Sequence, residues 1–302
     1  HGEEIKALEK LIAKKDYIQN GNGSYKQFDI FPTYIDRYKK EFGKLPNLPI
    51  VLDCGNGAAG VIARKLYEAV GLSPTILFEK PDGTFPNHHP DPTVEENLAD
   101  LAEKVRTNNA IVGIGFDGDA DRIGMVDHEG RMIFGDEILA FCARHVLKNN
   151  PGKIIVGDVK CSDRIFDDIK NYGGQPIMWK TGHSLIKDKV RSENAPFGGE
   201  LSGHIFFNDR NYGYDDALYA GLRVIEILGK TGKNFRELLD LPPAYNTPEL
   251  RIDTTEEKKY LIVEAVKNHF NDKNSSNYKV NLIDGIRISF QDGWALVRAS
   301  NT

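Results

Sequence analysis

Three aspartates alternate with small residues in the segment 117–122. They are Asp117, Asp119 and Asp121, and Arg122 follows them directly. In an extended segment, alternate side chains lie on one side, so the three carboxylates would repel one another unless a cation lay between them. Carboxylate oxygens suit Mg²⁺ or Mn²⁺, and the adjacent guanidinium suits a phosphate group. The segment therefore predicts a Mg²⁺ site beside a phosphate-binding arginine.

Two other interpretations of this segment can be weighed from the sequence. An EF-hand needs glycine at its sixth position and glutamate at its twelfth, where Arg122 and His128 stand here. That interpretation is therefore excluded. A solvated acidic turn is the simpler alternative, and the segment by itself leaves it open.

A glycine-rich turn lies at residues 55–60. Its sequence, Gly-Asn-Gly-Ala-Ala-Gly, matches a dinucleotide-binding fingerprint between an expected strand and an expected helix. Glu79 stands 19 residues after Gly60, where such a site places its ribose-binding carboxylate. An NAD-dependent oxidoreductase is one hypothesis, and a tight turn that needs small residues is the other. A lone fingerprint favours the second.

Three further segments gather polar side chains at glycine turns or strand ends. A carboxylate and a hydroxyl offer a sugar its acceptor and donor, an imidazole can share a proton, and arginine with hydroxyls can bind phosphate. Each segment has a simpler alternative, such as solvated side chains, a polar hairpin or a frayed end. The candidate ligand-binding residues are Lys160, Lys180, Thr181, Gly182, His183, Glu200, Ser202, His204, Arg298, Ser300, Asn301 and Thr302.

The elements that must position these residues alternate between strands and helices. A helix at 3–15 and a breaker cluster at 20–24 come first. The first α/β unit is expected to contain helices at 31–42, at 58–70 and from a capping box at Thr93 towards 104, strands at 50–53, 73–78 and 110–115, and a hairpin at 123–127 and 131–134. The second is expected to contain helices at 136–147, 162–170, 184–190 and 215–228, the last closed by Gly229, and strands at 153–156, 176–179 and 205–207.

The last segment changes to one helix at 256–270 followed by short strands, which indicates a small α+β unit. The expected division is a helical tail and linker at 1–26, a metal-binding α/β domain at 27–131, a sugar-binding α/β domain at 132–245 and a partial phosphate-binding α+β domain at 246–302.

Composition narrows the class of protein. The 302 residues are 40% hydrophobic and 27% charged, with a formal charge of −5, so nothing indicates a nucleic-acid or membrane surface. The three scattered cysteines favour a reducing compartment, so we expect the protein to be cytoplasmic. We also expect it to be a monomer. No apolar run has the length of a membrane span, and we expect no signal peptide.

Taken together and in this order, the motifs resemble the α-phosphohexomutase family, in particular its bacterial phosphomannomutase/phosphoglucomutase type. The matching segments are 55–60, 85–92, 117–122, 180–183, 199–204 and 298–302. Leu201 and Asn301 resemble the mannose and glucose type rather than the glucosamine type. In this family the glycine turn is structural and no nicotinamide is used.

The resemblance implies a fold, a reaction and roles for residues. The fold would be two consecutive α/β domains, with mixed sheets and flanking helices, followed by part of an α+β (TBP-like) lid. The reaction would be the interconversion of hexose 1-phosphate and 6-phosphate, for mannose or glucose, through a phosphoserine and a bisphosphate intermediate. Asp117, Asp119 and Asp121 would hold Mg²⁺, while Arg122, Lys160 and His204 would be catalytic. Glu200 and Ser202 would bind the sugar hydroxyls, and Arg298, Ser300, Asn301 and Thr302 the phosphate that does not react.

The sequence also departs from the family pattern. The donor loop Thr-Ala-Ser-His-Asn-Pro is absent, the helix at 3–15 resembles the end of a first domain, and the chain stops inside the phosphate loop. We therefore expect the 302 residues to lack turnover by themselves. A sugar-phosphate-binding protein without chemistry and a metal-dependent phosphatase are further hypotheses.

Overall fold

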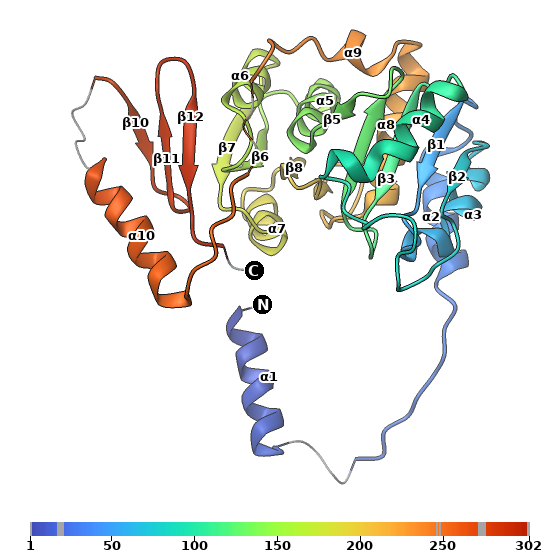
Figure 1. Cartoon of the computed structure of the whole chain (residues 1–302). Helices are drawn as coiled ribbons and strands as arrows, with labels where there is room; N and C mark the ends of the chain where they lie inside the picture. Colours follow the sequence, from blue (N-terminus) through green and yellow to red (C-terminus); the bar gives the residue numbers. More distant parts are fainter. Residues whose placement is uncertain (1, 17–20, 246, 248, 271–275, 301–302) are drawn as a thin grey trace.

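A computed structural model describes residues 2–16, 21–245, 247, 249–270 and 276–300 (Figure 1). Its body consists of two α/β units with mixed sheets and flanking helices, followed by a smaller α+β unit. The expected fold class is therefore confirmed. Helix α1 (Gly2–Lys14) precedes this body in the chain, and its side chains from residue 4 onwards are exposed. None of the helices in the described ranges is long and apolar enough to cross a membrane.

The first unit is organised around a five-stranded sheet in the order β2-β1-β3-β4-β5. Its strands are β1 (Ile50–Asp53), β2 (Thr75–Leu77), β3 (Val112–Phe116), β4 (Ile123–Asp127) and β5 (Met132–Ile133). The first three strands in the order are parallel, and β4 and β5 run antiparallel as the expected hairpin. Strands β1, β3 and β4 are buried along their whole length, which explains their continuous apolar runs.

The helices of this unit are α2 (Phe31–Phe42), a 3₁₀ turn at Ala58–Val61, α3 (Ala63–Ala69), a 3₁₀ turn at Glu95–Leu98 and α4 (Ala99–Thr107). Helix α2 has the expected bounds. The expected helix at 58–70 is instead two pieces, which meet at Ile62. The expected capping box at Thr93 is wrong, because the Thr93 hydroxyl donates to the Asp91 carboxylate over 2.7 Å. The chain after it begins as a 3₁₀ turn without a side-chain cap.

The second unit contains a four-stranded sheet in the order β7-β6-β8-β9, with β8 and β9 antiparallel and the other pairs parallel. Its elements are α5 (Gly135–Asn149), β6 (Ile154–Asp158), α6 (Asp163–Asn171), β7 (Gln175–Trp179), α7 (His183–Ser192), β8 (Phe197–Gly199), β9 (Ile205–Phe207), α8 (Ala217–Thr231) and α9 (Phe235–Leu238). The expected stop of α8 at Gly229 is wrong. The helix ends at Thr231 and is closed by Gly232, which has a positive φ, while Gly229 lies inside the helix against Pro46.

Helix α8 joins the two units into one hydrophobic core. It contacts β3 and β4 of the first sheet as well as β9 of the second. The hydroxyl of Tyr67 in the first unit donates to the Leu218 carbonyl over 3.2 Å, and Gly221 leaves space for that hydroxyl. The buried core cluster accordingly contains residues of both units.

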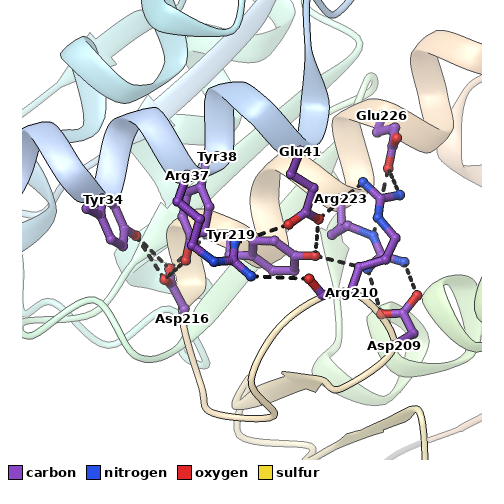
Figure 2. Close-up of polar contacts among 10 residues, drawn as sticks. All are labelled: Tyr34, Arg37, Tyr38, Glu41, Asp209, Arg210, Asp216, Tyr219, Arg223 and Glu226. Atoms are coloured by element: carbon purple, nitrogen blue, oxygen red, sulfur yellow. Dashed lines mark hydrogen bonds and ion pairs between the residues drawn. The ribbon is translucent and has the colours of Figure 1, made fainter.

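Polar contacts fasten α2 to α8 at the same junction (Figure 2). The hydroxyls of Tyr34 and Tyr38 both donate to the buried carboxylate of Asp216. Asp216 also caps α8 by accepting from the Tyr219 amide over 2.9 Å. The Tyr219 hydroxyl in turn donates to Glu41 of α2 over 2.5 Å. The start of α8 is therefore fixed relative to the first unit.

Ion pairs extend this junction (Figure 2). Arg223 donates to both oxygens of Asp209 over 2.8 Å each. Arg210 pairs with Glu226 over 2.8 Å and with Glu41 over 3.2 Å. Buried charges require such partners, and here the partners come from the loop before α8, from α8 and from α2.

The last unit consists of α10 (Glu256–His269) and the antiparallel strands β10 (Lys279–Asn281), β11 (Ile286–Ser289) and β12 (Trp294–Val297). Arg287 of β11 is buried and attaches this unit to the second one. Its guanidinium donates to the carbonyls of Val159 and Cys161 and to the Asp163 carboxylate, and it lies 3.8 Å from the Trp294 ring centroid.

Candidate active site

The acidic loop connects β3 to β4, which pair from Phe116 and Ile123 onwards. Ligand oxygens of Asp117, Asp119 and Asp121 all lie within 4.8 Å of one another. The sheet thus brings both ends of the loop together and gathers the three carboxylates that the sequence singled out.

The loop is held by Asp117, which is buried. One of its oxygens accepts the amide protons of Asp121 and Arg122 over 3.0 Å each, and the other accepts from Nε of Arg122 over 2.7 Å. A terminal nitrogen of Arg122 also donates to Asp91 over 3.2 Å. The guanidinium is therefore oriented from two sides, which leaves less conformational entropy to lose on binding a phosphate.

The electrostatics of the loop fit a divalent cation. Burial raises the pKa of Asp121 to about 6; the nearby His204 opposes this rise, and the carboxylates of Asp117 and Asp119 add to it. Negative charges that crowd in this way are stabilised by a bound cation. The donor set consists of carboxylates alone, which matches the preference of hard cations such as Mg²⁺.

The glycine turn supports the acidic loop. The Ala58 amide donates to the Gly118 carbonyl over 2.9 Å, and a Cβ at Gly57 would lie 2.7 Å from that same oxygen. A Cβ at Gly60 would overlap the Glu79 carbonyl oxygen. These close backbone approaches are what the small residues permit.

The same geometry weighs against the dinucleotide interpretation. The Glu79 carboxylate is bound by Arg64, whose Nε and terminal nitrogen donate over 2.8 and 2.6 Å. It is therefore engaged in a surface ion pair rather than free at the turn. The glycines of the turn are explained by packing alone.

The sugar-binding candidates lie in the turn between β8 and β9. Glu200 is buried, and its two oxygens accept from the Gly182 amide over 3.0 Å and from the Ser202 hydroxyl over 2.9 Å. Burial raises the pKa of Glu200 to about 7; Asp158 adds to the rise, and His204 opposes it. The hydrogen bond from the Gly182 amide therefore joins two motifs that are separate in the sequence, namely this turn and the segment 180–183.

Backbone contacts then join the turn between β8 and β9 to the acidic loop. Arg122 and His204 form an isolated antiparallel bridge, and the Ile123 amide donates to the Gly203 carbonyl over 3.0 Å. Gly203 has a φ of +91°, and a Cβ there would overlap the carbonyl oxygen of Ile123. The Ala217 amide at the start of α8 donates to the Ala120 carbonyl over 3.2 Å.

Asp215 is a site residue that the sequence analysis missed. Its carboxylate lies 2.9 Å from Nδ1 of His204, 3.4 Å from Nδ1 of His183 and 2.9 Å from Nζ of Lys187. The sequence placed Asp215 at the start of a helix. Its proximity to two candidate histidines could not be inferred from spacing, because the loop 208–216 carries it back to them.

Asp158, at the end of β6, was also missed. It accepts from the Thr181 hydroxyl over 2.8 Å and from the Leu201 amide over 3.1 Å, so it holds the segment 180–183 against the turn between β8 and β9. Its position at the carboxyl end of a parallel strand was a usable signal, because ligands of α/β sheets bind at that edge.

The remaining candidates include Lys160, Lys180 and Arg298. Lys160 pairs with Glu249 over 2.6 Å, and Lys180 is exposed. Asp284 accepts from the Thr181 amide and from Nε of Arg298, both over 3.2 Å, and thereby connects the last unit to the segment 180–183.

At the C-terminal end, the Ser300 carbonyl accepts from Lys259 over 2.7 Å. Asn301 and Thr302 lie outside the described residues.

Family models and known proteins match this chain in sequence and in fold. The family models of the second and third alpha/beta/alpha domains of phosphoglucomutase/phosphomannomutase match residues 32–130 and 134–245. A phosphomannomutase/phosphoglucomutase of Pseudomonas aeruginosa is 44% identical over 301 residues, covering 99% of this chain and 64% of that protein. A phosphoglucomutase of Neisseria gonorrhoeae is 40% identical over 305 residues, covering 100% of this chain and 65% of that protein.

A solved structure agrees with these relatives. A phosphoglucomutase/phosphomannomutase family protein from Burkholderia thailandensis matches with a TM-score of 0.90 and 42% identity, covering 100% of this chain and 64% of that one. The chain therefore spans just under two thirds of the length of the first curated relatives it matches. By sequence and by fold, it belongs to the phosphoglucomutase/phosphomannomutase family.

Proposed function

We propose that this chain forms the metal-binding and sugar-phosphate-binding part of a hexose-phosphate mutase. The observation that carries the proposal is the backbone bridge between Arg122 and His204, which joins the acidic loop to the turn between β8 and β9. A phosphoryl group held at the first would lie next to a sugar held at the second. This proximity is what transfer between the two requires, because such reactions depend mainly on positioning and charge neutralisation.

The proposal assigns Mg²⁺ to Asp117, Asp119 and Asp121, whose oxygens cluster within 4.8 Å. When bound, Mg²⁺ would neutralise charge on the reacting phosphoryl group. Arg122, already oriented by Asp117 and Asp91, would bind that group through its guanidinium.

The sugar would be bound through its hydroxyls. Glu200 is buried, and the Ser202 hydroxyl donates a hydrogen bond to its carboxylate, so the two side chains lie next to each other. The carboxylate would accept hydrogen bonds from a vicinal diol of the sugar, and the Ser202 hydroxyl would donate or accept one. Thr181, Gly182 and His183 would line the same place, since Glu200 accepts from the Gly182 amide. His204 would exchange a proton with the sugar hydroxyl that reacts.

The charged end of the substrate would face lysines and the last unit. Lys160 and Lys180 would contact phosphate or sugar oxygens, and Arg298 would bind the phosphate that does not react, with Ser300, Asn301 and Thr302. Asp284 already ties Arg298 to Thr181, so this phosphate and the sugar would be bound by connected segments. The substrates we propose are the 1- and 6-phosphates of mannose or glucose.

The sequence contains no Thr-Ala-Ser-His-Asn-Pro loop, so the proposal takes the phosphoryl donor from outside these 302 residues. Binding rather than turnover is therefore the test. Calorimetry of the chain with Mg²⁺ should show binding of glucose 1-phosphate and mannose 1-phosphate but not of NAD⁺. The Ser202→Ala variant should bind both sugar phosphates more weakly, whereas Ser192→Ala, on α7, should bind like the unaltered chain.

The outcome is decisive in both directions. Saturable hexose-phosphate binding that depends on Ser202 supports the proposal. Binding of NAD⁺ with no binding of hexose phosphates would refute it, as would steady release of inorganic phosphate from the sugar phosphates, which would indicate a phosphatase.

A further inference from the structure

A buried carboxylate lies among three basic side chains at the edge of the proposed site. The Asp215 side chain is only 6% exposed, and its oxygens lie 2.9 Å from Nδ1 of His204 and 2.9 Å from Nζ of Lys187. His183 approaches the same carboxylate at 3.4 Å, and its ring stacks on that of His204 with centroids 5.3 Å apart. One carboxylate thus contacts both histidines of the site.

The contact between Asp215 and His204 joins two buried polar atoms that each lack another hydrogen-bond partner among the described residues. Nδ1 of His204 and Oδ2 of Asp215 are both buried, and neither makes an aligned hydrogen bond to any residue that the structure describes. Buried polar atoms are normally paired, and these two lie within hydrogen-bond distance of each other, at 2.9 Å. Asp121 of the acidic loop lies on the same side of the ring, 3.6 Å from Nδ1.

The Asp215 carboxylate is held independently of the His204 ring, because Lys187 pairs with its other oxygen over 2.9 Å. The next residue, Asp216, accepts from Tyr34 and Tyr38 of α2 and from the Tyr219 amide (Figure 2). Asp215 itself forms a backbone bridge with Phe206. Because the backbone is held on both sides, Asp215 presents its carboxylate to His204 from a fixed position.

We propose that Asp215 is a positioning residue that holds His204 with Nδ1–H towards its carboxylate, leaving Nε2 as the nitrogen that meets the hexose phosphate. An imidazole that donates from one nitrogen to a carboxylate has its tautomer and its ring plane fixed. The second statement, on the hexose phosphate, rests on the proposed function. The first, on the tautomer, does not depend on any ligand.

The tautomer is tested on the 302-residue chain without metal or ligand. The ring nitrogens of ¹⁵N-histidine-labelled protein are observed by long-range ¹H–¹⁵N NMR while the pH is raised until the His204 ring shows the chemical shifts of the neutral imidazole. His204 is assigned by the signal lost in His204→Gln. We expect His204 to be protonated on Nδ1. Asp215→Ala should shift it towards the Nε2–H form that predominates in free neutral histidine.

Lys187→Met is the matched control, because it removes another charge next to Asp215 and leaves the carboxylate in place. It should keep the Nδ1–H tautomer. If Asp215→Ala does not fold, the unaltered chain still decides the matter, since an Nε2–H form of His204 there overturns the proposal. An unchanged tautomer in a folded Asp215→Ala variant overturns it as well.

A second measurement, of glucose 1-phosphate binding, distinguishes failure of this proposal from failure of the proposed function. With Mg²⁺ present, Asp215→Ala should weaken glucose 1-phosphate binding by about tenfold, the lower end of what loss of an orienting partner usually costs. If the unaltered chain binds no hexose phosphate but shows the Nδ1–H tautomer, the proposed function fails and the positioning role of Asp215 stands.

Discussion

The backbones of Arg122 and His204 pair as an isolated antiparallel bridge, and each residue directly precedes a strand of a different sheet. This bridge joins the acidic loop after β3 to the turn between β8 and β9. The Ile123 amide strengthens the junction by donating to the Gly203 carbonyl over 3.0 Å. The two halves of the proposed site are therefore one piece of structure, and changes at the junction should affect both.

Gly203→Ala tests this junction. Gly203 has a φ of +91°, and an added Cβ would overlap the Ile123 carbonyl oxygen, so backbone strain and a steric clash should combine. We expect a loss of about 3 kcal/mol or more in the free energy of unfolding by urea. Gly232→Ala is the control, because Gly232 also has a positive φ, +66°, but has nothing within 4 Å of the added Cβ. It should cost about 1 kcal/mol, and equal losses in the two variants would contradict the steric argument.

The acidic loop should bind Mg²⁺ through Asp119. This side chain is exposed, so Asp119→Asn should leave the fold intact while removing one charged ligand. We expect Mg²⁺ affinity measured by calorimetry to fall more than tenfold, which is over about 1.4 kcal/mol. Asp167→Asn, at an exposed carboxylate on α6, should bind Mg²⁺ like the unaltered chain. Unchanged affinity in Asp119→Asn would show that the ligand assignment is wrong.

The tyrosine contacts to Asp216 should hold the two α/β units together. Tyr38→Phe removes a donor to a buried carboxylate, and such a loss costs about 1–3 kcal/mol. Thermal unfolding followed by circular dichroism should keep a single transition, shifted to lower temperature, because the two units share one core. Tyr25→Phe, at a side chain that is 85% exposed, should change stability by less than about 0.5 kcal/mol. Two separated transitions in the unaltered chain would contradict the shared core.

Asp127 should contribute to acid sensitivity. Burial tends to raise the pKa of this carboxyl, but hydrogen bonds from the Arg131 amide and from the Arg236 and Arg131 side chains outweigh it, so the pKa lies below its usual value. The unfolded chain, with a pKa of about 3.9 for aspartate, takes up the proton first. The stabilisation is therefore complete above about pH 5 and is lost as the pH falls through the lowered pKa.

Urea unfolding between pH 7 and pH 3 measures this contribution. Asp127→Asn should be less stable than the unaltered chain at pH 7, and the difference should shrink towards pH 3. Asp100→Asn, at an exposed position on α4, should follow the unaltered chain throughout. A difference that stays constant with pH would mean that the Asp127 carboxylate does not carry the effect.

Local sequence determined much of the framework. Helix α2 and strands β1, β4 and β9 have the bounds that their apolar patterns predicted, because each is set by residues within the element. The order of the motifs likewise indicated the family, and the family models agree. Errors occurred where a local signal competed with a neighbour. Thr93 binds Asp91 instead of capping a helix, and α8 continues past Gly229 to Thr231.

Only the tertiary structure determined which motifs contact one another. Glycines 57 and 60 match a dinucleotide fingerprint in sequence, but in the structure they admit the backbones of the acidic loop and of Glu79. Asp215 looked like the first residue of a helix, yet it lies between His183, His204 and Lys187. Sequence spacing specifies neighbours along one strand or helix face, whereas the approach of distant residues depends on how sheets and α8 pack around a common core. That packing makes one site out of separate motifs.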